Sequence, residues 1–176
     1  TGEYNISYLE RYLKGEKLVL INLVTREQGL MVKAGNPLGI KSLADLTRPE
    51  IRFVNRQKGA GTRILLDYLL KNMEIDPAQI NGYGREEFSH LAVAAAVSND
   101  TADVSLGIYA SAQALGLDFI PVESERYDLC IAEDLVETSV LEALYQAIAD
   151  PEFVSATLSY GGYNLDMSGQ VVWRSG

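Results

Sequence analysis

The chain has 176 residues and a mass of 19.3 kDa, which is enough for one ordinary domain or two small lobes with a hydrophobic core. Hydrophobic residues make up 47% and charged residues 22%, a balance that is typical of globular proteins and excludes a disordered chain. The formal net charge of −9 argues against nucleic acid and against an anionic membrane as partners. No stretch has the ~20 consecutive apolar residues that a membrane-spanning helix needs.

Two residue types that occur only once exclude two kinds of site. The chain has one cysteine, Cys130, and one histidine, His90. No internal disulfide can form, which is compatible with a reducing compartment, and a multi-histidine metal site is excluded. Cys130 lies in an apolar run and is predicted to be buried in the core, while His90 is predicted to open a helix without a chemical role. We expect no metal and no cofactor.

Hydrophobic periodicity and turn residues predict alternating helices and strands. In chain order, the predicted elements are a short helix within residues 1–15, strands at 18–24 and 29–33 joined by a linker, a short helix at 42–46, a strand at 51–54 followed by a helix that includes 64–69, a short strand at 80–83, a helix at 90–97, a strand at 102–108, a helix at 109–115, strands at 117–122 and 127–132 joined by a polar crossing, helices at 139–148 and 151–160, and an edge segment at 171–173. This alternation indicates an α/β fold with mostly parallel sheets.

The strongest candidate for a binding site follows the strand at 51–54. The stretch Gly59-Ala60-Gly61-Thr62 has almost no side chains, so the first backbone N–H groups of the next helix are open to a ligand. These groups lie at the positive end of the helix dipole and suit an anion. Thr62 can add a hydroxyl donor and Arg56 a charged, bidentate one. Such a turn can equally serve only to make a tight corner, and the residues alone leave both interpretations open.

Two nucleotide-binding motifs are incomplete at this turn. A P-loop requires Lys followed by Ser or Thr after its last glycine, whereas Thr62 and Arg63 follow Gly61. A dinucleotide-binding fingerprint requires a third glycine where Ile64 stands, together with a later acidic residue. The turn therefore favours a small oxyanion over a nucleotide.

A second turn of the same kind follows the strand at 102–108. Ligands of α/β proteins bind beyond the carboxyl ends of strands, at helix N-termini, so Gly107-Ile108-Tyr109 also qualifies. Gly107 removes a side chain, and Tyr109 can cover or hydrogen-bond a ligand. A tight corner is again the alternative interpretation.

Several strings covering nearly the whole chain resemble one family. They are TGEYN, REQGLMVKAGNPLGIKSLADL, RFVNRQKGAGTRILLDYLL, EEFSHLAVAAAV, TADVSLGIYASAQALGLDFIPV and ERYDLCI. They are similar to the periplasmic-binding-protein-like domain fused to molybdate-responsive helix-turn-helix regulators and to molybdopterin-biosynthesis enzymes. The resemblance implies a two-lobed type II binding-protein fold with a ligand cleft between the lobes. One lobe would comprise residues 49–120, and the other, residues 1–48 and 121–176, would lack its first β-α segment.

The resemblance also implies which residues contact the ligand. Seven positions match the family's ligand shell: Arg56, Ala60, Gly61, Thr62, Ile108, Tyr109 and Tyr127. The first four form the oxyanion cradle at the Gly-rich turn, the next two form the second turn, and Tyr127 lies where the chain crosses between the lobes. Arg63 and Arg26 are weaker candidates, because Arg63 can lie along the helix surface and Arg26 in a solvated turn.

The leading hypothesis is a ligand-sensing module that is not an enzyme. A small oxyanion, molybdate or tungstate, would bind in the inter-lobe cleft, and the module would regulate a fused DNA-binding or molybdopterin-biosynthesis domain. The expected location is the cytoplasm, with the periplasm as the alternative, and a homodimer is a candidate assembly.

Two alternative functions remain open. In the first, the domain has lost its ligand and serves only to dimerise or dock. This alternative gains if Arg56 and Thr62 are held by internal hydrogen bonds and do not point into an open cleft. In the second, the domain is a transferase that acts on a phosphorylated substrate at the same turn, with Glu86, Glu87 or Asp103 as its general base.

Overall fold

The computed structural model describes residues 6–136 and 138–175. The chain divides into two compact units: unit 1 comprises Thr1–Arg26, Glu125–Ser159 and Tyr163–Gly176, and unit 2 comprises Glu27–Ser124 and Tyr160–Gly162. The first helix, α1, spans Ile6–Tyr12, whereas the TGEYN string lies outside the described residues.

The predicted lobe at residues 49–120 lies entirely within unit 2. Unit 2 also contains residues 27–48 and 121–124, which the resemblance implies for the other lobe. The reason is that β1 (Leu18–Val32) pairs with β4 (Val104–Ile108), with Leu30 opposite Leu106. Leu43 also belongs to the same core as these two residues.

Unit 2 is built on a sheet with the strand order β3-β2-β4-β1-β5. β2 (Phe53–Arg56) runs parallel to β3 (Glu86–Glu87) and to β4, whereas β1 runs antiparallel to β4. β5 spans Asp118–Ala132. The helical elements are η1 (Leu43–Thr47), α2 (Gly61–Asn72), η2 (Pro77–Gln79), α3 (His90–Ser98) and α4 (Tyr109–Ala114). The α/β class is therefore confirmed, and the parallel strands lead into the two candidate turns.

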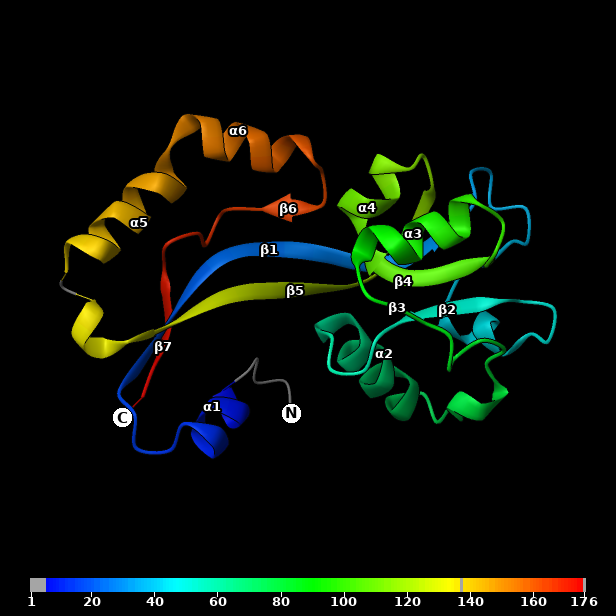
Figure 1. Ribbon diagram of the computed structural model, residues 1–176, viewed down its shortest axis with the longest axis horizontal. Helices are drawn as coiled ribbons and strands as arrows, with labels where there is room; N and C mark the ends of the chain where they lie inside the picture. The colour runs from blue at the N-terminus through cyan, green and yellow to red at the C-terminus, as the bar shows by residue number, and fades with distance from the viewer. Residues whose placement is uncertain (1–5, 137, 176) are drawn as a thin grey trace. The chain divides into compact units, whose positions relative to one another are not determined.

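Two hydrophobic cores cover the two faces of β2 and β4. Phe53 belongs to the core that contains Leu66 of α2, and Val54 belongs to the core that contains Val93 of α3. Neighbouring residues of a strand point to opposite faces of a sheet. One short strand thus anchors a helix on each side, with α2 on one side of the strands and α3 on the other (Figure 1).

Unit 1 uses the other half of β1. β6 (Tyr163–Asn164) and β7 (Val171–Arg174) both pair antiparallel with β1. The remaining elements are η3 (Glu133–Leu135), α5 (Ser139–Ala149) and α6 (Pro151–Ser159). The core joins Val19 and Ile21 of β1 to Leu141 of α5.

β1 and β5 are each continuous where the sequence predicts two strands. The expected linker at 25–28 lies within β1, where Arg26 pairs with Tyr163 and Gln28 pairs with Ile108. The expected polar crossing at 123–125 likewise lies within β5. Polar residues can continue a strand when neighbouring strands pair their backbone groups, so polarity alone did not mark a break here.

Two further predictions are wrong. Residues 80–83 form turns and not a strand: the N–H of Tyr83 donates to the carbonyl of Ile80 at 3.1 Å, and the strand beside β2 is β3. Cys130 is exposed and not buried. Successive residues of β5 point to opposite faces, and it is Ile131 that packs against the core of unit 1.

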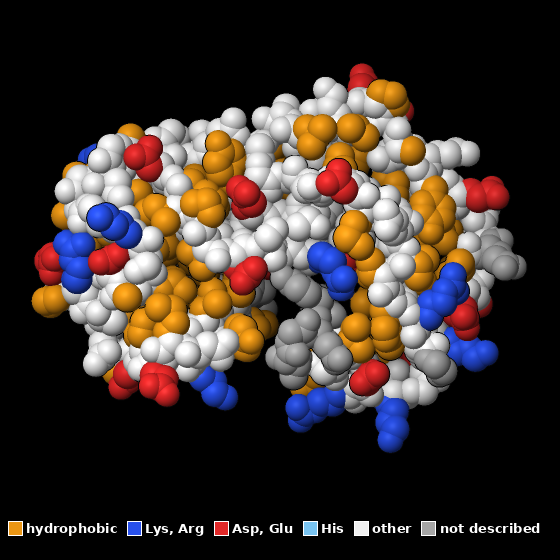
Figure 2. Space-filling model, turned by 180° about the vertical axis from the view of Figure 1, so that it is seen from behind, with side chains coloured by type: hydrophobic (Ala, Val, Ile, Leu, Met, Phe, Trp, Pro, Cys, Tyr) orange, Lys and Arg blue, Asp and Glu red, His pale blue; other side chains and the backbone are white. Residues whose placement is uncertain are grey.

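Charged side chains are scattered over the face shown in Figure 2, where the side chains drawn in colour form no continuous basic patch. Some basic groups are paired internally, such as Lys33 with Asp100 at 2.6 Å and Arg48 with Glu50 at 2.8 Å. The helices that the structure describes are all too short or too polar to cross a membrane.

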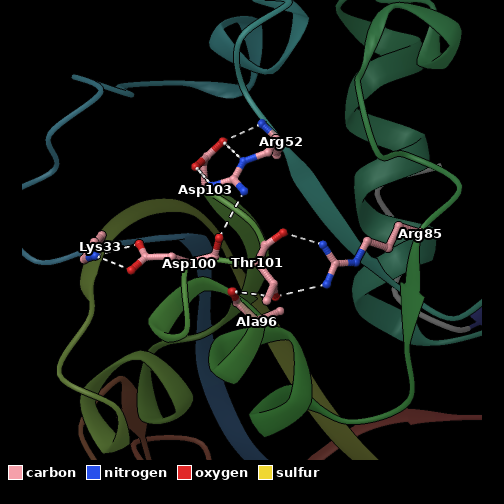
Figure 3. A network of polar contacts seen from close by, with 7 residues as sticks. All are labelled: Lys33, Arg52, Arg85, Ala96, Asp100, Thr101 and Asp103. Atoms are coloured by element: carbon pink, nitrogen blue, oxygen red, sulfur yellow. Dashed lines mark hydrogen bonds and ion pairs between the residues drawn. The ribbon is translucent and has the colours of Figure 1, made fainter.

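A charged network joins the amino ends of β2 and β4, at the edge of the sheet opposite the two candidate turns (Figure 3). The backbone N–H and Nε of Arg52 donate to Asp103 Oδ2 at 2.7 and 3.0 Å. Arg52 Nη1 also donates to the carbonyl of Asp100 at 3.0 Å, and Lys33 Nζ lies 2.6 Å from Asp100 Oδ1. The hydrogen bond from Arg52 outweighs burial and lowers the pKa of Asp103 below its ordinary value.

Replacing Asp103 with Ala is expected to lower the free energy of unfolding by about 1–2 kcal/mol, since charged hydrogen bonds are lost but Arg52 is half exposed. The folded-state pKa is below the unfolded one. The stabilisation is therefore present above the ordinary carboxyl pKa of about 3.9 and is lost as the pH falls through the lowered pKa. Urea unfolding of wild type and Asp103→Ala from pH 7 to pH 2 tests this expectation. The difference between their free energies of unfolding should shrink as the pH falls.

Lys33→Ala is the matched control, because its ion pair with Asp100 is largely exposed and contributes less than about 1 kcal/mol. Equal losses for Asp103→Ala and Lys33→Ala at pH 7 would contradict the role given to Asp103.

Candidate functional site

The turn between β2 and α2 leaves the start of the helix without a side-chain cap. α2 begins at Gly61, and its N-cap residue, Ala60, makes no side-chain hydrogen bond to the first turn. The first N–H groups of an α-helix have no partner within the helix and form the positive end of its dipole. Gly61 is exposed, so solvent and small ligands can reach the beginning of α2.

The two glycines of this turn have different roles. Gly59 has a φ of +88°, a left-handed conformation that other residues rarely adopt, so the corner itself requires it. Gly61 is helical, and a Cβ at this position would meet no atom within 4 Å. Neither packing nor backbone conformation requires glycine at position 61. The start of α2 is therefore left uncovered by any side chain at this position, although one would fit.

Gln28 is a candidate site residue that the sequence reasoning missed. It lies in β1 opposite Ile108, is fully buried, and accepts a hydrogen bond from the Thr62 hydroxyl at 3.0 Å. Within the described part of the chain, its Nε2 has no hydrogen-bond partner. Gln28 was placed in a linker. One signal in the sequence could have identified it. Gln28 directly precedes the apolar run at 29–33, so it can belong to the same buried strand as a polar residue.

Arg56 is the last residue of β2 and only 8% exposed. Its Nε donates to Gln57 Oε1 at 3.1 Å, and its Nη2 donates to the carbonyl of Phe88 at 3.3 Å. Thr62 is also buried and donates to Gln28. Both predicted donors are thus held by internal hydrogen bonds, the observation named above as favouring a ligand-free module.

The second turn has a clear structural reason for its glycine. A Cβ on Gly107 would lie 2.5 Å from Met31 Cε, so a side chain there would force the buried Met31 side chain of β1 to move. Ile108 is the N-cap of α4 and is buried, and it makes no side-chain cap. α4 has only six residues, so its dipole is short. This geometry accounts for the tight corner without a ligand.

Tyr109 lines a hollow of about 530 Å³ within unit 2, together with Asn36, Gln113 and Asp118 among others. Its ring packs edge-on against Phe119 with 5.2 Å between ring centroids. A Cβ on Gly162 would lie 2.4 Å from Tyr109 Cβ, so a side chain at position 162 would clash with the tyrosine. Tyr109 therefore has a packing role whether or not it contacts a ligand.

Arg63 does not serve the turn. Its Nε and Nη1 donate to Asp67 and Glu86, each at 2.9 Å, and its guanidinium carbon lies 4.3 Å from the centre of the Tyr83 ring. Burial alone would lower the pKa of Arg63, but its interactions with Asp67 and Tyr83 outweigh this and raise it. Through these contacts, Arg63 connects α2 to β3 and to Tyr83 in the turn before β3.

Arg26 and Tyr127 belong to unit 1, whereas the seven other candidates belong to unit 2. Arg26 is a strand residue of β1 and forms an ion pair with Glu125. Its guanidinium carbon lies 5.1 Å from the centre of the Tyr127 ring. The expected solvated turn at Arg26 is wrong, and the expected ligand contact of Tyr127 stays a prediction.

Two of the three candidate general bases are held in ion pairs. Asp103 is bonded to Arg52 at the opposite edge of the sheet, and Glu86 is paired with Arg63. His90 is the first residue of α3, whose N-cap Ser89 accepts from the N–H of Ala92 at 3.0 Å. No group of three or more His, Cys, Asp or Glu side chains in the described ranges could hold a metal.

The model of the PBP superfamily domain matches residues 1–149, and the chain belongs to that family of periplasmic-binding-protein-like domains. One relative is the uncharacterized protein YvgK of Bacillus subtilis (strain 168), which is 39% identical over 173 residues. The match covers 98% of this chain but 55% of YvgK, so the chain spans about half the length of that curated relative.

Solved structures share the fold at low sequence identity. The substrate-binding domain of a candidate molybdenum ABC transporter from Clostridium difficile has a TM-score of 0.60 at 13% identity, covering 93% of this chain and 73% of that chain. The CcmR regulatory domain of Synechocystis PCC6803, in complex with 2-PG, has a TM-score of 0.59 at 14% identity, covering 77% and 67%. PEB3 with bound L-phospholactate has a TM-score of 0.58 at 19% identity, covering 82% and 68%. The first is a substrate-binding domain, and the other two structures hold a bound small molecule.

Thr62→Val retains the shape of the side chain but removes the hydroxyl that pairs with Gln28. An unpaired buried polar group costs about 1–3 kcal/mol, and we expect the free energy of unfolding to fall by that amount. Urea unfolding measures it. Thr47→Val is the control, because the Thr47 hydroxyl bonds the Ala44 carbonyl at an exposed site and its loss should cost less. Unchanged stability of Thr62→Val would contradict the Thr62–Gln28 bond.

Proposed function

We propose that the domain binds a small oxyanion at the start of α2 and acts as a ligand sensor. The observation that carries this proposal is the uncapped, exposed first turn of α2, where Gly61 leaves the backbone open without any packing reason. Free N–H groups at a helix N-terminus bind anions through neutral dipoles, so the net charge of −9 is no obstacle.

Molybdate or tungstate is the proposed ligand, because the chain resembles molybdate-responsive proteins and because N–H donors suit a tetrahedral dianion. A likeness to a candidate molybdenum transporter domain and to structures holding 2-PG or L-phospholactate supports a ligand of anionic character. Ala60, Gly61 and Thr62 are the proposed contacts at the turn, and Arg56 supplies positive charge one residue before it. Ile108, Tyr109 and Tyr127 are retained as proposed contacts from the resemblance alone.

Regulation of a fused domain is the second part of the proposal. A ligand can shift a conformational equilibrium only if it binds one state better than the other. YvgK is longer than the matched segment, so related domains occur with additional chain. We propose that an attached DNA-binding or molybdopterin-biosynthesis domain reads out the ligand in the cytoplasm, and that the domain is not an enzyme.

A ligand-free interaction module is the second candidate function. It is favoured by the burial and the internal hydrogen bonds of Arg56 and Thr62. In this case the domain would serve to dock or to form a homodimer, and the start of α2 would be an ordinary corner.

Thermal unfolding with and without millimolar molybdate, tungstate or sulfate distinguishes the two functions. A ligand that binds only the folded state stabilises it by about 2.7 kcal/mol at a hundredfold excess over Kd. We expect molybdate or tungstate to raise the unfolding temperature. No rise with any of the anions, together with a dimer in sedimentation analysis, would favour the interaction module.

The variant Gly61→Val tests whether the anion binds at the start of α2. Since a Cβ at position 61 meets no neighbouring atom, the variant should stay folded while its branched side chain covers the first-turn N–H groups, and the affinity for the anion should fall about tenfold or more. Gly84→Val is the matched control, because Gly84 also has free space for a Cβ and precedes β3 at the other edge of the sheet. Equal affinity in both variants, measured by titration calorimetry, would remove the start of α2 from the site.

A further inference from the structure

The buried amide of Gln28 is satisfied at one end only. Its Oε1 accepts a hydrogen bond from the Thr62 hydroxyl at 3.0 Å, and its Nε2 has no hydrogen-bond partner among the described residues. A fully buried amide without a partner is costly, and such groups normally meet a bound water or a ligand. Because Nε2 can only donate, the missing partner must be a hydrogen-bond acceptor.

The position of this amide connects it to the start of α2. Gln28 pairs with Ile108, the last residue of β4, and Thr62 is the second residue of α2. The amide therefore lies at the carboxyl edge of the parallel strands, beside the first turn of the helix. An acceptor placed against Nε2 would adjoin the same first-turn N–H groups.

We propose that the Thr62–Gln28 pair makes this site selective for oxyanions that carry no proton. Thr62 turns the amide so that its carbonyl is occupied and its N–H₂ group faces the ligand. The first-turn N–H groups and Gln28 Nε2 then all donate to the ligand. This inference rests on the proposed function and adds the chemical class of the ligand and a positioning role for Thr62.

The chemistry predicts a preference between two anions of equal charge. At pH 8, sulfate and hydrogen phosphate are both dianions, but hydrogen phosphate has one O–H group. A site built of donors leaves that O–H without an acceptor, and an unpaired polar group weakens binding severalfold to a hundredfold. Sulfate, molybdate and tungstate accept at every oxygen. The reverse orientation of the amide would present Oε1 instead and would favour hydrogen phosphate.

Titration calorimetry at pH 8 with sulfate, tungstate and hydrogen phosphate tests the inference on the wild-type chain. We expect sulfate or tungstate to bind about tenfold or more tightly than hydrogen phosphate. If an oxyanion binds but hydrogen phosphate binds equally well or better, the selectivity is overturned while the proposed function stands. If no oxyanion binds, the proposed function fails, and the inference fails with it.

Two variants separate a binding role of Gln28 from a purely structural one. The double variant Gln28→Met/Thr62→Val replaces both partners with apolar side chains of similar shape, which is nearly neutral for stability. We expect it to stay folded and to lose affinity for sulfate and tungstate about tenfold. Gln28→Glu keeps an acceptor for Thr62 but replaces the N–H₂ group with a second oxygen, and it should reverse the preference in favour of hydrogen phosphate. Wild-type affinity in the folded double variant would overturn the role of Gln28.

Discussion

The backbone N–H groups at the first turn of α2, which no side chain of the described residues caps, are the constraint on which the function of the domain depends. A helix must satisfy these groups with a side-chain cap, with water or with a ligand. α2 has no side-chain cap, and Gly61 keeps its beginning open although neither packing nor backbone conformation requires glycine there. The helix is fixed in place by Leu66 in the core and by Arg63, which holds Asp67 and Glu86. The open end is therefore attached to a firmly packed helix.

The sheet places a second hydrogen-bonding group, the Gln28 amide, beside the start of α2. β1 carries Gln28 next to the end of β4, and the bond from Thr62 fixes its amide against α2. A purely structural corner needs Gly59 with its left-handed conformation, but it does not need a buried amide whose Nε2 lacks a partner. At the second turn, by contrast, packing of Met31 explains Gly107, and Phe119 accounts for the position of Tyr109.

Local pattern identified most of the elements and the Gly-rich turn, because hydrophobic periodicity reflects which side of a helix or strand is buried. It failed for β1, since polar residues within 25–28 are paired with strands distant in the sequence, and for β5, whose polar residues at 123–125 lie within one continuous strand. Gln28 was missed for the same reason: its importance comes from Thr62 and Ile108, which only the tertiary fold brings near. The internal bonds of Arg56 are likewise invisible in a one-dimensional pattern.

Nuclear magnetic resonance of the ¹⁵N-labelled chain during titration with tungstate tests the central claim most directly, because it observes the proposed donors themselves. We expect the backbone N–H signals of Gly61 and Thr62 and the side-chain N–H₂ signals of Gln28 to shift together and to saturate with one Kd. Signals of Arg52 at the opposite edge of the sheet should stay in place. A saturating shift elsewhere in the chain, with the Gly61, Thr62 and Gln28 signals unmoved, would contradict the account.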